Sequence, residues 1–174
     1  MKKLVILGID PGYAILGYGL ISYKNCKFTP LGYGSILTQS NTPFEDRLKI
    51  IYDNLSEIFT KIKPDAMSIE KLYFQNNQKT ALSVSEARGV ILLCARNFNV
   101  PIYEYTPLQV KTAVTGYGKA TKLQVMEMTK RLLNLQKTPK FDDTTDALAI
   151  AICHIQARGS AFRHKSYDKR SYLK

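Results

Sequence analysis

Two acidic residues, Asp143 and Asp146, stand three positions apart at the start of an apolar run over 142–152. If that run is a helix, the spacing directs both carboxylates toward nearly the same side. Carboxylates held this close repel one another unless a cation lies between them, and oxygen donors suit hard divalent metals. Acids at a helix start also bind free backbone amides, and we expect one of Asp142, Asp143 and Asp146 to cap the helix. The pair alone is therefore a weak signal.

Two further acids end apolar runs that are typical of strands: Asp10 follows 4–9, and Glu70 follows 66–69. If these runs are neighbouring strands, both carboxylates can lie beside the helical pair. An unpaired carboxylate at a buried strand end is costly or stays protonated, so Glu70 favours a cation partner. Asp10 alone also fits a strand-ending turn, and Gly12 would admit a close backbone or phosphate. Together the four acids predict two Mg²⁺ ions, with Mn²⁺ as a substitute, that support in-line hydrolysis of a phosphodiester.

The chain is strongly basic, with 25 Lys and Arg against 14 Asp and Glu, a net charge of +11 and a pI near 9.6. This balance favours a polyanionic partner, because neutralising phosphates releases their counterions. No stretch approaches the roughly 20 apolar residues that cross a bilayer, and the first residues lead into a strand pattern instead of a signal peptide. We therefore expect a cytoplasmic protein with no membrane contact.

Five residues are candidates for contacts with nucleic acid. Tyr73 and Phe74 follow the strand-end glutamate and can stack on unpaired bases, although either ring could instead fill the core. Lys111, Lys119 and Lys122 flank a glycine turn at 116–118 and can meet phosphates. Lysines of this kind are more often simply solvated. We favour a binding role, because a polyanion must be held beside acids that would otherwise repel it.

The cysteines and histidines offer no competing chemistry. Cys26, Cys94 and Cys153 are widely separated and odd in number, which predicts buried, reduced thiols. His154 lies deep in the last helical pattern and His164 in the tail, so we expect a helix-surface residue and a solvated residue. Neither histidine is placed like a general base.

The order of the elements predicts an α/β fold, a mixed sheet with helices on both faces. Residues 1–157 form one nuclease domain in this interpretation, and 158–174 form a basic tail that is flexible without a partner. The first three strands should be sequential neighbours in an antiparallel meander. The expected strands cover 3–9, 16–23, 28–37, 66–69 and 102–105. The first expected helix starts within 42–45 and continues until 63–64, and the others cover 83–97, 107–114, a segment capped by Thr121, and 142–156.

An ordered set of motifs from Leu7 to about His154 resembles the RuvC Holliday-junction resolvase family, a branch of the ribonuclease H-like superfamily. The motifs are Gly8-Ile9-Asp10-Pro11-Gly12, Ile69-Glu70 with Tyr73, Glu86-Ala87-Arg88-Gly89, Gln109-Val110-Lys111, Gly116-x-Gly118 with Lys122, and Asp143-x-x-Asp146-Ala147-Leu148-Ala149. Such an ordered set is highly specific. The basic tail lies outside it.

The resemblance implies a five-stranded ribonuclease H-like sheet, with three antiparallel strands followed by parallel ones. It also implies a homodimer that nicks two symmetrically placed strands of a four-way DNA junction in recombination and repair, served by a branch-migration complex. Asp10, Glu70, Asp143 and Asp146 would be the Mg²⁺ ligands, although some members place His where Asp143 stands. Tyr73 would help open the junction, Arg88 would contact DNA, and helix 83–97 would contribute to the dimer.

Three other interpretations remain open. The Gly-Ile-Asp-x-Gly strand turn also occurs in actin-like ATPases and sugar kinases, where it meets a nucleotide phosphate. Those proteins close two such domains around ATP, and this chain is too short for a second. A related nuclease acting on RNA and a junction-binding protein without catalysis are the other two. The set of four acids argues against the last.

Overall fold

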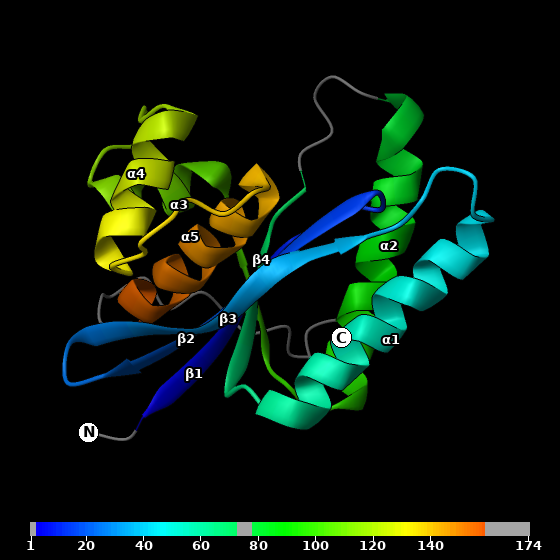
Figure 1. Ribbon diagram of the computed structural model, residues 1–174, viewed down its shortest axis with the longest axis horizontal. Helices are drawn as coiled ribbons and strands as arrows, with labels where there is room; N and C mark the ends of the chain where they lie inside the picture. Colours follow the sequence, from blue (N-terminus) through cyan, green and yellow to red (C-terminus); the bar gives the residue numbers. More distant parts are fainter. Residues whose placement is uncertain (1–2, 73–77, 159–174) are drawn as a thin grey trace, which may run out of the picture.

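The computed structural model describes residues 3–72 and 78–158, and its centre is a five-stranded sheet in the order β3-β2-β1-β4-β5 (Figure 1). The first three strands pair antiparallel, whereas β1, β4 and β5 pair parallel. The expected mixed sheet and the expected meander are therefore both confirmed. The strands are β1 (Leu4–Asp10), β2 (Ile15–Lys24), β3 (Lys27–Leu37), β4 (Ala66–Glu70) and β5 (Ile102–Tyr105).

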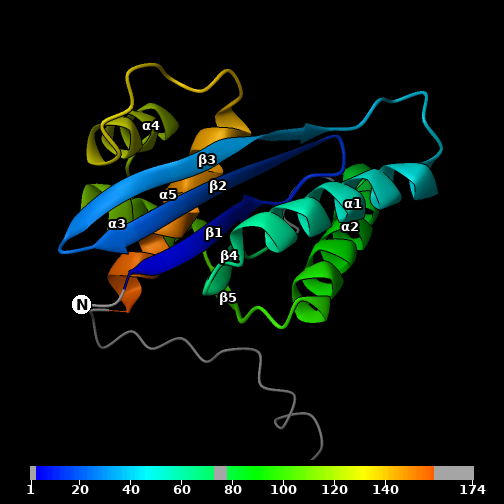
Figure 2. The same ribbon diagram turned by 60° about the horizontal axis from the view of Figure 1, so that its bottom comes forward.

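Helices cover both faces of the sheet (Figures 1 and 2). One face packs against α1 (Phe44–Ile62) and α2 (Gln78–Asn97), and the other packs against α5 (Asp142–Ala157), which α3 (Pro107–Thr115) and α4 (Lys122–Leu132) cover in turn. Successive side chains of β1 point to opposite faces of the sheet, so the core has two halves. Ile6 packs in the half beside α5, and Leu7 packs in the half beside α1 and α2. A central strand buried on both faces explains why its sequence is almost wholly apolar.

Local signals place most helix starts where the sequence indicates them. Thr121 caps α4 through a capping box with Gln124, as expected, and Thr106 caps α3 in the same way with Gln109. The start of α2 differs, because the helix begins at Gln78 and not at 83. Its extra turn carries Leu82, which is 69% exposed, so no apolar periodicity announces it.

Two expectations about single residues are wrong. His154 is 1% exposed and not on the helix surface, because α5 lies between the sheet and the layer of α3 and α4. Its Nδ1 is hydrogen-bonded to the Tyr105 hydroxyl at 2.8 Å. Cys26 is exposed in the turn between β2 and β3, where its φ of 60° leaves the thiol outside the core, whereas Cys94 and Cys153 are buried as expected.

No helix among the described residues is long and apolar enough to span a membrane. The last helix ends at Ala157, and residues 159–174 lie outside the described part of the chain. The division into a domain and a tail at 157 and 158 therefore stays a prediction.

Candidate active site

The acids that end two strands lie side by side. Strands β1 and β4 are parallel and adjacent, with Ile9 opposite Ile69, so Asp10 and Glu70 follow at the same edge of the sheet. Both side chains are half-buried. The carboxyl ends of parallel strands are where open α/β sheets present ligand-binding residues. The condition set by the sequence, that the two apolar runs are neighbouring strands, is therefore met.

Glycines bring the start of α5 against the same edge. In β2, Gly17 pairs with Asp10, and a β-carbon at Gly17 would lie 2.0 Å from the carbonyl oxygen of Asp143. One strand over, a β-carbon at Gly8 would lie 2.0 Å from the carbonyl oxygen of Ala147. Because no other residue fits, α5 packs directly on the strand backbones, and Asp143 and Asp146 are held near Asp10.

A hydroxyl pair fixes the same end of the helix from a third strand, since Ser35 Oγ and Thr144 Oγ1 lie 2.7 Å apart. The sequence-based reasoning missed these packing positions. Glycines inside strands are a recognised sign of close backbone approach, so Gly8 and Gly17 were the available signal. Gly12 admits a close backbone, one of the two expected roles, because its β-carbon would meet the Ile15 carbonyl oxygen at 2.0 Å. Gly12 therefore serves its own turn.

The four acids act on one another electrostatically. Burial, followed by the charges of Glu70, Asp146 and Asp143, raises the pKa of Asp10 to about 8. Burial and then Asp146 raise the pKa of Glu70, against the lysines at 122 and 111. Burial also raises the pKa of Asp146, although Lys122 opposes it. Acids from β1, β4 and α5 therefore form one cluster in which burial and mutual repulsion disfavour full ionisation.

The donors in this cluster fit a hard divalent metal, because all are carboxylates and their crowding disfavours the ionised state without a cation. As the side chains stand, however, no three His, Cys, Asp or Glu side chains within residues 3–72 and 78–158 are close enough together to hold an ion. Asp146 is instead engaged by Lys122, whose Nζ lies 3.2 Å from Asp146 Oδ2. Shared ligation of a metal therefore requires these side chains to rotate.

The start of α5 also corrects the expectation that an acid caps this helix. Phe141 is the N-cap residue, and no side chain caps the helix by a hydrogen bond. Asp142 is exposed, and its Oδ2 lies 3.4 Å from Lys122 Nζ. A full positive charge within reach attracts this carboxylate more strongly than the partial charges of the helix amides. Lys122, Asp142 and Asp146 line a hollow of about 240 Å³ together with Leu123, Met126 and Thr145.

The remaining candidates for DNA contact have different surroundings. Lys111 in α3 is close enough for its charge to lower the pKa of Glu70, and Lys119 precedes α4. Arg88 in α2 forms an ion pair with Glu104 of β5, and its side chain is only 13% exposed. This environment favours a structural role for Arg88 over a phosphate contact. Tyr73 and Phe74 lie outside the described residues.

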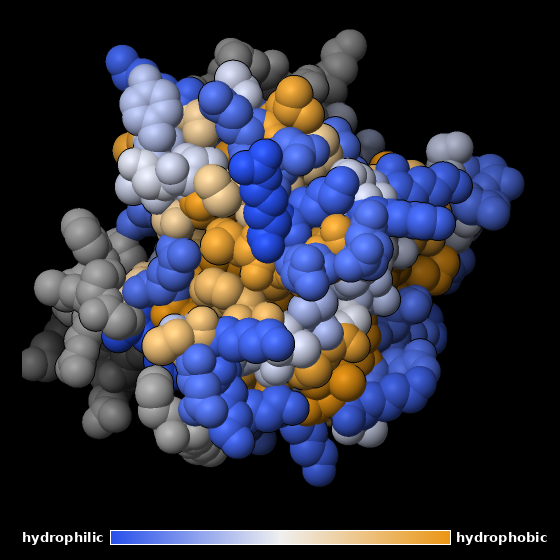
Figure 3. Space-filling view, turned by 60° about the vertical axis from the view of Figure 1, so that its left-hand side comes forward, coloured by the Kyte–Doolittle hydropathy of each residue, from blue (hydrophilic) through white to orange (hydrophobic). Residues whose placement is uncertain are grey.

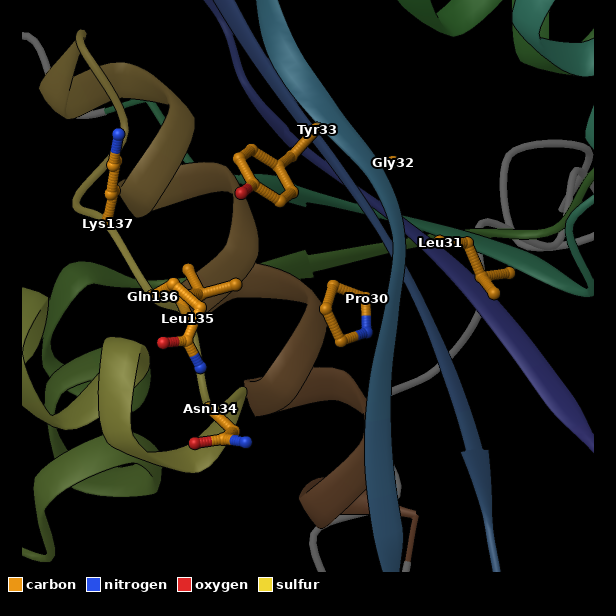
Figure 4. A pocket seen from close by; sticks show the side chains of 8 residues that line it. All are labelled: Pro30, Leu31, Gly32, Tyr33, Asn134, Leu135, Gln136 and Lys137. Atoms are coloured by element: carbon orange, nitrogen blue, oxygen red, sulfur yellow. The ribbon is translucent and has the colours of Figure 1, made fainter.

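The side of the molecule that carries α3, α4 and α5 has hydrophilic side chains around an apolar strip (Figure 3). A second hollow, of about 460 Å³, lies between β3 and the segment 134–137. Pro30 and Tyr33 point toward that segment, whereas Leu31 points away (Figure 4). Lys137 is the only charged residue among those that line it. Because no carboxylate lines it within the described part of the chain, this hollow does not have the chemistry of the acidic cluster.

Known proteins resemble this chain over most of its length, and they belong to the family that the motifs resemble. The family model described as crossover junction endodeoxyribonuclease RuvC matches residues 6–154. A RuvC from Alkaliphilus oremlandii is 56% identical over 151 residues, which are 87% of this chain and 92% of that relative.

Solved structures agree with the ribonuclease H-like fold inferred from the sequence. The Thermus thermophilus RuvC structure is 32% identical, with a TM-score of 0.83 over 90% of this chain and 96% of that one. The same protein in complex with a Holliday junction substrate is 29% identical, with a TM-score of 0.84 over 91% and 98% of the two chains. Since the family model spans the whole interval that holds the four acids, this chain belongs to the RuvC family of crossover junction endodeoxyribonucleases.

Proposed function

We propose that this chain resolves four-way DNA junctions by paired symmetric nicks, as a metal-dependent endodeoxyribonuclease of homologous recombination and DNA repair. The observation that carries the proposal is the acidic cluster, in which a carboxyl from β1 has its pKa raised to about 8 by burial and by acids from β4 and α5. Membership of the RuvC family supplies the substrate class, and the solved Thermus thermophilus relative is bound to a Holliday junction.

Asp10, Glu70, Asp143 and Asp146 are the proposed ligands of two Mg²⁺ ions per site, with Mn²⁺ as a substitute. When bound, such ions lower the pKa of a water molecule and neutralise charge on the scissile phosphate and the leaving oxygen. Asp10, whose pKa burial and the neighbouring acids raise to about 8, would bind such an ion as the carboxylate, because a nearby positive charge favours the ionised form.

The basic side chains counter the repulsion between the cluster and DNA. We assign phosphate contacts to Lys111 and Lys122, whose charges already act on the acids, and to Lys119 beside them. Tyr73 and Phe74 follow the β4 acid in sequence, and we retain them as candidates to stack on unpaired bases at the junction.

A homodimer suits a substrate with two equivalent strands, and α2 offers a face for it. Leu82, Glu86, Gly89 and Leu93 are exposed and spaced to lie along one side of the helix. A β-carbon at Gly89 would meet nothing within 4 Å, although glycine in a helix costs about 1 kcal/mol relative to alanine. A second α2 crossing at Gly89 would explain that cost. Sedimentation that shows only monomer at micromolar concentration would remove this part of the proposal.

We further propose a cytoplasmic location, a branch-migration complex as partner, and a division into a nuclease domain over 1–157 and a basic tail over 158–174. These follow from the family and from the charge of the sequence. A tail with an excess of Lys and Arg adds electrostatic attraction to DNA without sequence preference.

One assay tests the central proposal. The purified chain is incubated with Mg²⁺ and a four-way junction, a linear duplex or a structured RNA of matched length. Selective cutting of the junction on two opposed strands is expected. Asp10→Asn, Glu70→Gln and Asp146→Asn should lose cutting and keep junction binding, which native gels measure. Cutting of RNA alone, or ATP turnover without DNA, would favour one of the rival functions.

A further inference from the structure

Lys122 occupies an unusual position for a lysine that is expected to bind DNA. It is the first residue of α4, and its Nζ lies 3.2 Å from Asp146 Oδ2 and 3.4 Å from Asp142 Oδ2. Its charge also opposes the rise in the pKa values of Asp10 and Glu70. A single ammonium group therefore acts on acids from three elements of the cluster.

The ammonium group of Lys122 lies beside Asp146, where a bound metal ion would also have to lie. Asp146 is one of the four proposed metal ligands, and an ion bound to its Oδ2 would lie close to Nζ of Lys122. Two positive centres on one carboxylate oxygen repel, so the ion pair and the metal compete for Asp146. Asp142 lies outside the set of proposed ligands and gives the ammonium a second partner.

We propose that Lys122 neutralises the acidic cluster in the DNA-free chain and competes with the divalent ion, until a phosphate of the junction takes the ammonium away from Asp146. Divalent ions and junction DNA then bind cooperatively, because each favours the arrangement in which Lys122 has left Asp146. The acids are thereby protected from loading with metal before the substrate is present. This inference rests on the proposed nuclease function and adds a form of regulation to it.

The exposure of the groups sets the size of the effect. The side chains of Lys122 and Asp146 are 63% and 33% exposed, so solvent screens their attraction. Exposed pairs contribute weakly, and we expect the competition to change metal affinity by roughly two- to fivefold. A barrier of this size is small enough for DNA phosphates to overcome.

The first test measures Mn²⁺ binding to the full DNA-free chain by electron paramagnetic resonance of the free ion. Lys122→Met should bind Mn²⁺ roughly two- to fivefold more tightly than the parent. Lys122→Arg keeps the charge and should stay near the parent. Lys119→Met is the matched control, because it removes the same charge from the same segment and Lys119 forms no ion pair with any described residue. Equal or weaker binding by Lys122→Met relative to Lys119→Met would overturn the inference.

The second test measures cooperativity through junction affinity, followed by fluorescence anisotropy with and without Ca²⁺. The gain in affinity that Ca²⁺ gives the parent should shrink in Lys122→Met and persist in Lys119→Met. An undiminished gain would also overturn the inference.

The cleavage assay on the parent separates this inference from the proposed function. If the parent cuts junctions and Lys122→Met does not bind Mn²⁺ more tightly, the competition is refuted and the nuclease function stands. If Lys122→Met binds Mn²⁺ more tightly and the parent cuts no junction, the competition stands and the nuclease function fails.

Discussion

Replacing Asp10 by asparagine should stabilise the metal-free protein at alkaline pH. The folded chain holds a proton on Asp10 up to pH about 8, because burial and the neighbouring acids raise its pKa from the ordinary value of 3.8. Stability from this group is therefore fully present below pH 4 and is lost as the pH rises toward 8. Asparagine is always neutral and nearly isosteric, so the variant escapes the loss.

The pKa difference sets an upper bound on the effect. About four pH units at about 1.36 kcal/mol each correspond to roughly 5 kcal/mol in the free energy of unfolding. Asp10 is half-buried and Lys122 opposes the shift, so solvent and that charge reduce the gain, and we expect about 2 kcal/mol or more at pH 8.

Urea unfolding in a chelator at pH 5 and pH 8 measures this gain. The parent should lose stability between the two values, and Asp10→Asn should lose much less. Asp53→Asn is the control, because Asp53 is an exposed acid of α1 paired with Lys49. With millimolar Mg²⁺ at pH 8 the parent should recover stability, since an ion that binds only the folded state stabilises it, and Asp10→Asn should recover less. Equal stability of parent and variant at pH 8 without metal would refute the idea that the acids are crowded.

Three further changes test packing and buried charge, one of them beside the acidic cluster. Gly17→Ala puts a methyl group about 2.0 Å from a carbonyl oxygen of α5, so we expect roughly 2 kcal/mol or more of lost stability by urea unfolding and lost junction cleavage. Gly32→Ala is the control, because a β-carbon at Gly32 would meet nothing within 4 Å, and it should change neither the stability nor the junction cleavage. Arg88→Met should lower the free energy of unfolding by roughly 3 kcal/mol, because it leaves Glu104 half-buried and unpaired, and adding Glu104→Leu should recover most of that loss. If Arg88→Met alone left the stability unchanged, the ion pair would contribute nothing. Burial and then Arg158 lower the pKa of His154 to about 4. The stability that this neutral histidine contributes above pH 6.5 should therefore fall by roughly 3 kcal/mol as the pH drops toward 4. In thermal unfolding, His154→Gln should not show this loss.

The strands and the acids at their ends could be predicted because each is a local signal. An apolar run that stops at a single carboxylate specifies both the strand and the residue at its end, which is why Asp10 and Glu70 were placed correctly. The parallel pairing of β1 with β4 then follows from a crossover through α1. The three-residue spacing of Asp143 and Asp146 likewise needs nothing beyond helix geometry.

The features that sequence reasoning missed depend on contacts between distant segments. His154 has the sequence context of an ordinary helix residue, and only the layer of α3 and α4 makes it buried. The contact between Lys122 and Asp146 joins residues from two helices, and no local pattern announces it. Arg88 has the charge of a DNA-binding residue, yet its surroundings include Glu104 from another element. In each case tertiary packing decides the role of the side chain.

The acidic cluster also explains why α5 is held so firmly. Repulsion among the ionised carboxylates pushes the start of α5 away from the edge where Asp10 lies, and it does so most above pH about 8, where Asp10 has lost its proton, when no metal is present. The fold opposes this force by direct contact of the helix backbone with Gly8 and Gly17, and by the hydroxyl pair of Ser35 and Thr144. The rest of α5, from Ala147 to Ile155, is buried, so its apolar surface adds burial free energy that cannot be recovered if the helix shifts. The glycines therefore matter to the proposed metal site as much as the acids do, because without their close contact the carboxylates of α5 would move apart from those of the strands.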